Sequence, residues 1–289
     1  MKKSFILLSL VTAINFIGCD KIKDPIEKKN TAVGSNFITK SNALVSNFKK
    51  VLLEDYTGHT CGNCPAAAIK ADSLAAAYTS SLVVIAVHAG FFAKVKANYP
   101  TSYTTTVGND WDGSSGFGIS AVGNPNGMVN RKDYAGNGLI QKESKWPTTV
   151  KLGLEDPFIV KLDVTTNYDP SVRALNTNVK AIFKTNYPNS IKLSVVLTED
   201  EIIGAQTDYT KIPDLVPDYK YQHMLRDAIN GSWGDILKTA PIVINDSAKV
   251  VYPNFALNSS FNDNNISVIV FAYDALTKEV LQVEKVKIK

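Results

Sequence analysis

Two cysteines, Cys61 and Cys64, lie between an apolar stretch and an alanine-rich stretch, and this arrangement limits the fold more than any other feature. Apolar periodicity predicts a strand over residues 51–56, a helix over 64–78 and a buried strand over 82–87. A strand, a helix and a second strand form a right-handed crossover with a parallel pair. The cysteines then lie at the carboxyl end of the first strand, where α/β proteins usually place their sites.

The N-terminus predicts export. Lys2, Lys3 and the apolar run 5–17 lead to Gly18-Cys19, which resembles a lipoprotein signal peptide over residues 1–18. Cleavage before Cys19 would leave that residue carrying acyl chains such as palmitate, enough for stable membrane anchoring. A plain secretory signal and a short membrane helix are the alternatives, although the run falls short of the ~20 residues that a bilayer needs.

Residues 19–46 are polar and lysine-rich without hydrophobic periodicity, which predicts a flexible lipid-anchored tether. Without Lys2 and Lys3 the chain has 29 basic and 27 acidic residues, a balance that gives no reason to expect nucleic-acid binding. The expected partners are the membrane, through the lipid, and thiols of exported proteins or peptides.

Exported proteins meet an oxidising compartment, so Cys61 and Cys64 are expected to be mostly disulfide-bonded unless a reductant is supplied. Cys61 is expected over the helix N-terminus, whose unpaired N–H groups and dipole favour a thiolate.

A second motif surrounds Pro125. The glycine- and asparagine-rich turn 122–127 and the short apolar strand after it resemble the cis-proline loop that faces the thiol pair in thioredoxin-like proteins. Together with the strand, the Cys-x-x-Cys pair and the second strand, this loop resembles the thioredoxin superfamily. The resemblance implies a thioredoxin-like domain over residues 47–150, with Cys61, Cys64 and Pro125 in its catalytic site.

A more specific set of sequence motifs resembles the twenty-eight-kilodalton outer-membrane protein family of lipoproteins. It comprises Thr57-Gly58-x-x-Cys61-x-x-Cys64-Pro65, Asn130-Arg131, and the later segments 221–226 and 230–234. This resemblance implies a bacterial cell-envelope protein at the outer membrane. Pro65 and Asn63 depart from the usual thioredoxin motif, but a proline is tolerated in a first helical turn.

Asp55 is the candidate for the buried acid that thioredoxin-like proteins often place near the thiols, where it would help to remove a proton from Cys64. Glu54 is the rival, because neighbours on a strand face opposite sides. A solvated acid at the strand end is the third interpretation.

His59, two residues before Cys61, raises the question of a metal. His88 and His223 are the only other histidines, whereas a closed zinc site takes four ligands. The favoured interpretation therefore has no metal and no cofactor. A copper site with fewer soft ligands is the alternative. Haem attachment in its common form is excluded because Pro65 follows Cys64.

Residues 88–119 form an insertion rich in aromatics and glycine. It is either a lid that selects a peptide substrate or a loop that packs its own rings onto the domain, and the second is favoured.

From residue 157 the apolar period becomes two, and the pattern predicts an immunoglobulin-like antiparallel β-sandwich over 155–289 with a final hairpin turn at 274–277. The fold class is therefore an α/β thioredoxin-like domain followed by an all-β sandwich. The segment around His223, Arg226 and Trp233 interrupts this pattern and receives no role.

Two functions remain open. The protein is a thiol-disulfide exchange protein in which Cys61 attacks and Cys64 resolves, or a non-catalytic envelope lipoprotein whose disulfide is structural and whose sandwich mediates adhesion or assembly. A disulfide that closes so short a loop contributes little stability, which favours the first.

Overall fold

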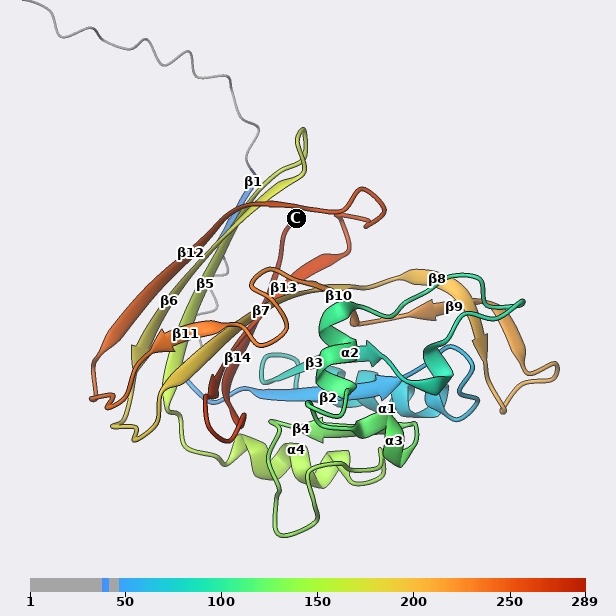
Figure 1. The fold of residues 1–289 in the computed structure, drawn as a ribbon, viewed down its shortest axis with the longest axis horizontal. Helices are drawn as coiled ribbons and strands as arrows, with labels where there is room; N and C mark the ends of the chain where they lie inside the picture. Colours follow the sequence, from blue (N-terminus) through green and yellow to red (C-terminus); the bar gives the residue numbers. More distant parts are fainter. Residues whose placement is uncertain (1–37, 42–46) are drawn as a thin grey trace, which may run out of the picture. The chain divides into compact units, whose positions relative to one another are not determined.

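The computed structural model describes residues 38–41 and 47–289, and these residues belong to one compact unit (Figure 1). The predicted signal peptide and Cys19 lie outside the described residues, as does most of the predicted tether. The exception is β1 (Ile38–Ser41), which pairs antiparallel with β5 (Val160–Asp169). The tether prediction is corrected there, because a strand edge offers hydrogen-bond partners that a polar sequence pattern does not reveal.

The predicted crossover is present. β2 (Val51–Thr57) and β3 (Leu82–His88) are parallel and are joined by α1 (Cys64–Ala77), so the elements expected from the sequence are confirmed to within a residue. β4 (Asn126–Val129) pairs antiparallel with the other side of β2. All of β2 is buried because the sheet is covered on both faces.

One face of β2 and β3 packs on α1 and on α4 (Trp146–Leu154), with Leu53, Ala71 and Trp146 in the shared cluster. The other face packs against the insertion, which holds the short helix η1 (Phe91–Ala93), α2 (Thr106–Asp112) and α3 (Ile119–Val122). Trp111 is fully buried there and Tyr103 nearly so, whereas Phe91 is largely exposed. The insertion therefore packs most of its rings onto the domain.

The second half is antiparallel β-structure, as the period of two predicts. A four-stranded sheet has the order β1-β5-β6-β12, with β6 at Ala174–Phe183 and β12 at Ser247–Ala256. It shares a core with the strands β7 (Ile191–Glu199), β13 (Ile266–Asp274) and β14 (Val280–Lys287). Asp274 accepts hydrogen bonds from the backbone N–H groups of Leu276 and Thr277, which fixes the predicted turn.

The two halves share one sheet, which the sequence pattern does not suggest. Its order is β14-β13-β7-β10-β3-β2-β4, with β11 (Asp235–Lys238) paired to β7. The connecting strand β10 (Met224–Ala228) is antiparallel to β7 and meets β3 in parallel at Met224 and Ala86. Met224 and Leu225 are buried, so this segment fills the space between the halves. The change of pattern near residue 155 marks a change in the type of element within one continuous sheet.

A separate hairpin, β8 (Ile202–Thr207) and β9 (Leu215–Tyr221), forms a two-stranded sheet that extends toward the start of α1 (Figure 1). No helix among residues 38–41 and 47–289 is long and apolar enough to cross a membrane.

Candidate functional site

The cysteine pair lies at the junction of β2 and α1, where the sequence places it. Cys61 and Cys64 form a disulfide with a Cα–Cα distance of 5.4 Å. A tight turn brings them together, because the N–H of Cys61 donates to Gly58 O at 3.0 Å and that of Cys64 donates to Cys61 O at 3.1 Å. Pro65 follows within the first helical turn, where its missing donor costs nothing.

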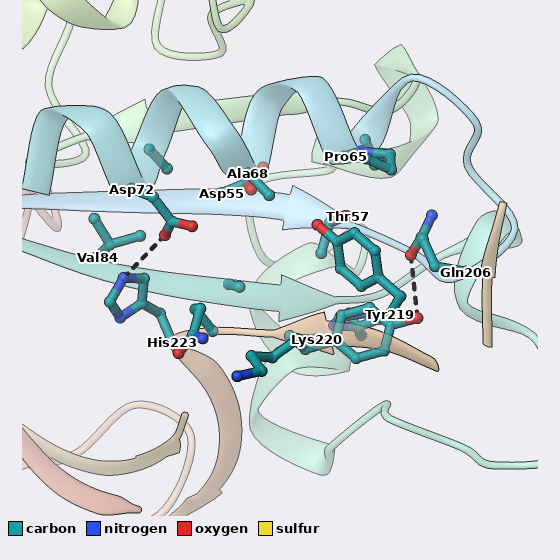
Figure 2. Close-up of a pocket in the computed structure, with 16 residues that line it drawn as sticks. Asp55, Thr57, Pro65, Ala68, Asp72, Val84, Gln206, Tyr219, Lys220 and His223 are labelled. Carbon is teal, nitrogen blue, oxygen red and sulfur yellow. Dashed lines mark hydrogen bonds and ion pairs between the residues drawn. The ribbon is translucent and has the colours of Figure 1, made fainter. Parts of the chain in front are cut away.

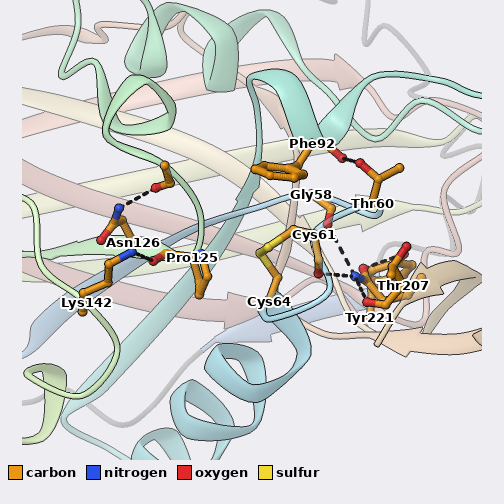
Figure 3. The surroundings of a disulfide bond; sticks show 12 residues. Gly58, Thr60, Cys61, Cys64, Phe92, Pro125, Asn126, Lys142, Thr207 and Tyr221 are labelled. Carbon is orange, nitrogen blue, oxygen red and sulfur yellow. Dashed lines mark hydrogen bonds between the residues drawn. A yellow bond between two sulfur atoms is a disulfide. The ribbon is translucent and has the colours of Figure 1, made fainter. Parts of the chain in front are cut away.

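Pro125 belongs to the loop between α3 and β4, and the peptide bond Asn124–Pro125 is cis. Figure 3 shows Pro125 facing the disulfide, with Phe92 on a neighbouring side. The Lys142 ammonium donates to Pro125 O at 3.4 Å, and the Asn126 side-chain amide donates to Gly123 O. The structure thus brings together the cysteines and the proline that the sequence analysis selected.

The disulfide is covered. Cys61 is 2% exposed and Cys64 is 1% exposed. The hairpin β8–β9 closes over the cysteine loop through backbone contacts: Thr207 N–H donates to His59 O at 2.9 Å, and Tyr209 N–H donates to Gly62 O at 3.0 Å. The buried Gln206 amide donates to Cys61 O at 3.0 Å. Sequence reasoning missed these residues, because backbone contacts between segments about 145 residues apart leave no pattern to read.

The position of the Tyr209 ring suggests a test of this cover. A Cβ atom at Gly62 would clash with the Tyr209 ring, so the ring rests directly on the cysteine loop. Tyr209→Ala removes that contact, and we expect dithiothreitol to reduce the disulfide about threefold faster or more, because local opening then costs less free energy. Thiol counting by mass spectrometry measures the rate.

The matched control for the hairpin is Ile212→Ala, since Ile212 is fully exposed in the loop between β8 and β9. Equal reduction rates for the wild type and Tyr209→Ala would show that the hairpin does not limit access to the sulfurs.

Asp55 and Glu54 face opposite sides of β2, and their environments differ. Asp55 is 1% exposed and lines the cavity shown in Figure 2. The cavity has a volume of about 30 Å³, and Cys64 and His88 also line it. Its Oδ1 has no hydrogen-bond partner among the residues that the structure describes. Burial raises the pKa of Asp55 to about 8, and the nearby Asp72 and Glu143 carboxylates add to the rise. Asp55 is therefore neither a solvated acid nor a paired one.

Glu54 instead forms a two-pronged ion pair with Arg131, at 2.9 Å from Arg131 Nε and 2.7 Å from Nη2. Both side chains are 1% exposed. The Asn130-Arg131 motif thus has a structural role: Asn130 Oδ1 accepts from the backbone N–H of Leu52, and Arg131 neutralises Glu54. Sequence reasoning noted the motif without finding this pair.

The buried Asp55 carboxyl makes stability depend on pH. Its pKa is about 8 in the folded protein and about 4 in the unfolded chain, so its contribution to stability is complete below about pH 4 and lost as the pH rises to about 8. At pH above about 8, Asp55→Asn should exceed the wild type in free energy of unfolding by about 2 kcal/mol or more. Urea unfolding of the oxidised protein measures this.

Asp218→Asn, at an exposed position on β9, is the control for the removal of a carboxylate. An Asp55→Asn variant with the same pH dependence as the wild type would contradict the burial of an unpaired carboxyl.

The histidines do not assemble a metal site. His59 stacks on Tyr99 with ring centroids 5.4 Å apart, and its Nε2 lies 2.9 Å from Lys94 O. His88 is buried edge-on between Tyr103 and Tyr221, and burial lowers its pKa to about 3. Within residues 38–41 and 47–289 no three His, Cys, Asp or Glu side chains are grouped as metal ligands would be.

A mixed sheet that carries a buried Cys-x-x-Cys disulfide at the start of a helix defines the class of this fold. HBP35 of Porphyromonas gingivalis shares the fold, with a TM-score of 0.61 and 17% sequence identity over 84% of this chain and 76% of that one. A protein from Agrobacterium tumefaciens is more distant, with a TM-score of 0.49 and 13% identity over 84% and 96% of the two chains. No curated protein matches the chain.

The chain belongs to the family of the outer membrane protein Omp28, whose family model matches residues 116–289. A solved domain of the outer membrane lipoprotein Omp28 from Porphyromonas gingivalis is also similar, with a TM-score of 0.29 and 23% identity over 46% of this chain and 89% of that one. The match to the family model confirms the resemblance to the twenty-eight-kilodalton outer-membrane protein family. The matched region includes Pro125 and Arg131 but begins after the cysteine pair.

Proposed function

We propose that this protein is a lipid-anchored thiol-disulfide exchange protein of the cell envelope, acting on exported proteins or peptides. The observation that carries the proposal is the buried Asp55 carboxyl in the cavity that Cys64 also lines. An unpaired acid in the protein interior costs stability, and a structural disulfide has no use for it. A resolving thiol must lose a proton, and a buried carboxyl with a raised pKa can accept that proton.

The surrounding fold supports this function. We take β2, α1, β3 and β4, with Pro125 opposite the disulfide, as a thioredoxin-like unit, and the second half as an immunoglobulin-like sandwich fused to it through β10. The anchor is part of the proposal: Lys2, Lys3 and Cys19 suit a lipoprotein signal peptide, and membership of an outer-membrane family agrees with that location.

In the proposed cycle the reduced Cys61 thiolate attacks a substrate disulfide, which forms a mixed disulfide and releases one substrate thiolate. Cys64 then gives its proton to the Asp55 carboxylate, and its sulfur attacks the Cys61 sulfur. The bond from Cys61 to the substrate breaks, and its electron pair leaves on the substrate sulfur. The substrate is reduced, the pair is oxidised, and an external dithiol reductant must restore it.

One observation favours the second function. The cysteines are only 1–2% exposed and lie under a hydrogen-bonded hairpin, as is expected for a structural disulfide. In that case the pair would take no part in exchange, and the sandwich would mediate adhesion or assembly.

Reduction of insulin disulfides in the presence of dithiothreitol separates the two functions. The exchange function predicts that catalytic amounts of the wild-type protein accelerate the reduction. A rate equal to that of dithiothreitol alone would leave the structural function.

A further inference from the structure

His223 comes from the part of the chain matched by the family model, yet it lines the same cavity as Asp55 and Cys64. The cavity that holds Asp55 runs beneath α1, and Figure 2 shows Pro65 and Gln206 at one end and Asp72 and His223 at the other, with Asp55 between them. Cys64, which precedes Pro65, lines the same cavity. The resolving thiol, the buried acid and this histidine therefore line one pocket.

His223 is held in a defined orientation. Its backbone has a φ of 56°, its N–H donates to Asp200 Oδ1 at 2.7 Å, and its carbonyl accepts from Ala86 N–H at 2.8 Å. The ring then lies between two carboxylates, with Nδ1 3.2 Å from Asp200 and Nε2 3.3 Å from Asp72. The Asp72 side chain is 47% exposed and the His223 side chain 19%, so this end of the cavity reaches solvent.

The charge states of His223 and Asp55 are coupled. Burial opposes a charged imidazole, but the Asp200 and Asp72 carboxylates on either side of the ring outweigh burial and raise the pKa of His223, even though the Lys285 ammonium acts the other way. Burial, Asp72 and Glu143 raise the pKa of Asp55, whereas a charged His223 lowers it. Each group thus responds to the proton on the other.

We propose that His223 and Asp72 form the port through which the Asp55 carboxyl exchanges its proton with solvent. The inference rests on the proposed exchange function. During resolution the Cys64 proton passes to Asp55, and the port then carries it through the cavity to His223 and Asp72 and on to bulk water. His223 and Asp72 are positioning residues, since they act through Asp55 and touch neither sulfur nor substrate.

The test follows one turnover of the reduced full-length protein with oxidised glutathione, using acid quenching and mass spectrometry across a pH series. Conversion of the mixed disulfide into the Cys61–Cys64 disulfide reports resolution. Asp72→Asn and His223→Asn are expected to slow this step about tenfold near neutral pH. Asparagine tolerates a positive φ, so it suits position 223. Added imidazole should restore the rate, and neither change should slow resolution further in an Asp55→Asn background.

Lys220→Gln is the matched control, because Lys220 lines the same end of the cavity but pairs with Glu201 at the surface. Variants as fast as the wild type, or equally slowed in the Asp55→Asn background, would overturn the port. Failure of the wild type to form a mixed disulfide would instead reject the exchange function.

A second readout needs no turnover. In the oxidised protein, NMR titration of the Asp55 carboxyl should give a higher pKa in His223→Asn than in the wild type, because the positive charge is lost. An unchanged pKa would also overturn the port. If His223→Asn does not fold, Asp72→Asn still decides the kinetic question, since its side chain is half exposed.

Discussion

Cys61→Ser is expected to abolish catalysed disulfide exchange, with a loss of roughly 100-fold or more that leaves only the uncatalysed rate. Cys61 is the candidate attacking sulfur because it precedes α1 and lies opposite Pro125, whereas Cys64 lies within the helix and lines the Asp55 cavity. A serine hydroxyl at position 61 cannot form the mixed disulfide. Turnover of insulin disulfides with dithiothreitol measures the loss.

The companion variant Cys64→Ser separates attack from resolution. It keeps the attacking sulfur and lacks the resolving one, so the mixed disulfide should accumulate and be visible as an added substrate mass. Exchange that persists in Cys61→Ser, or a Cys64→Ser variant that traps nothing while the wild type turns over, would contradict the assigned roles.

The largest effect on stability is expected at Arg131. Its guanidinium carries the charge that pairs with Glu54, and both side chains are buried. Aromatic rings surround it, with centroids 4.6 Å away for Trp111 and 4.9 Å for Phe271. Arg131→Met would fill most of this space but leave the Glu54 carboxylate buried without a partner, which costs about 3–5 kcal/mol. Guanidinium unfolding of the oxidised protein measures the change.

The double variant Glu54→Gln with Arg131→Met is the control for this pair. Replacement of both charges should recover most of the loss, because a buried ion pair contributes little relative to neutral groups of similar shape. Arg131→Lys keeps the charge but not the two-pronged geometry, so it should lie between the wild type and Arg131→Met. Equal destabilisation of the single and double variants would show that packing of the arginine, not its charge, sets the cost.

Local signals in the sequence predict the elements around the cysteines. The apolar runs define β2 and β3, and the position of Cys61 and Cys64 between a strand and a helix follows from them. The alternation from residue 157 likewise predicts β5, in which buried and partly buried residues alternate along most of the strand. These signals are read within a single element, which is why they transfer to the structure.

The features that the sequence does not predict depend on contacts between segments that are far apart in the chain. Short strand β10 joins the two halves through one residue pair with β3, Met224 and Ala86, and nothing in its few residues specifies that neighbour. The cover over the cysteines uses backbone groups of residues 207 and 209, which any side chain provides. Alternation along β2 separates Asp55 from Glu54, but only the structure shows that Glu54 has a partner and Asp55 does not.

The reduction potential of the Cys61–Cys64 pair tests the central claim most directly, by equilibration of the full-length protein against glutathione and mass-spectrometric thiol counting. The exchange function predicts a value between about −270 and −120 mV, the span of known thiol oxidoreductases. A value below about −300 mV would contradict it, because such a pair is a structural disulfide that the glutathione pool does not reduce.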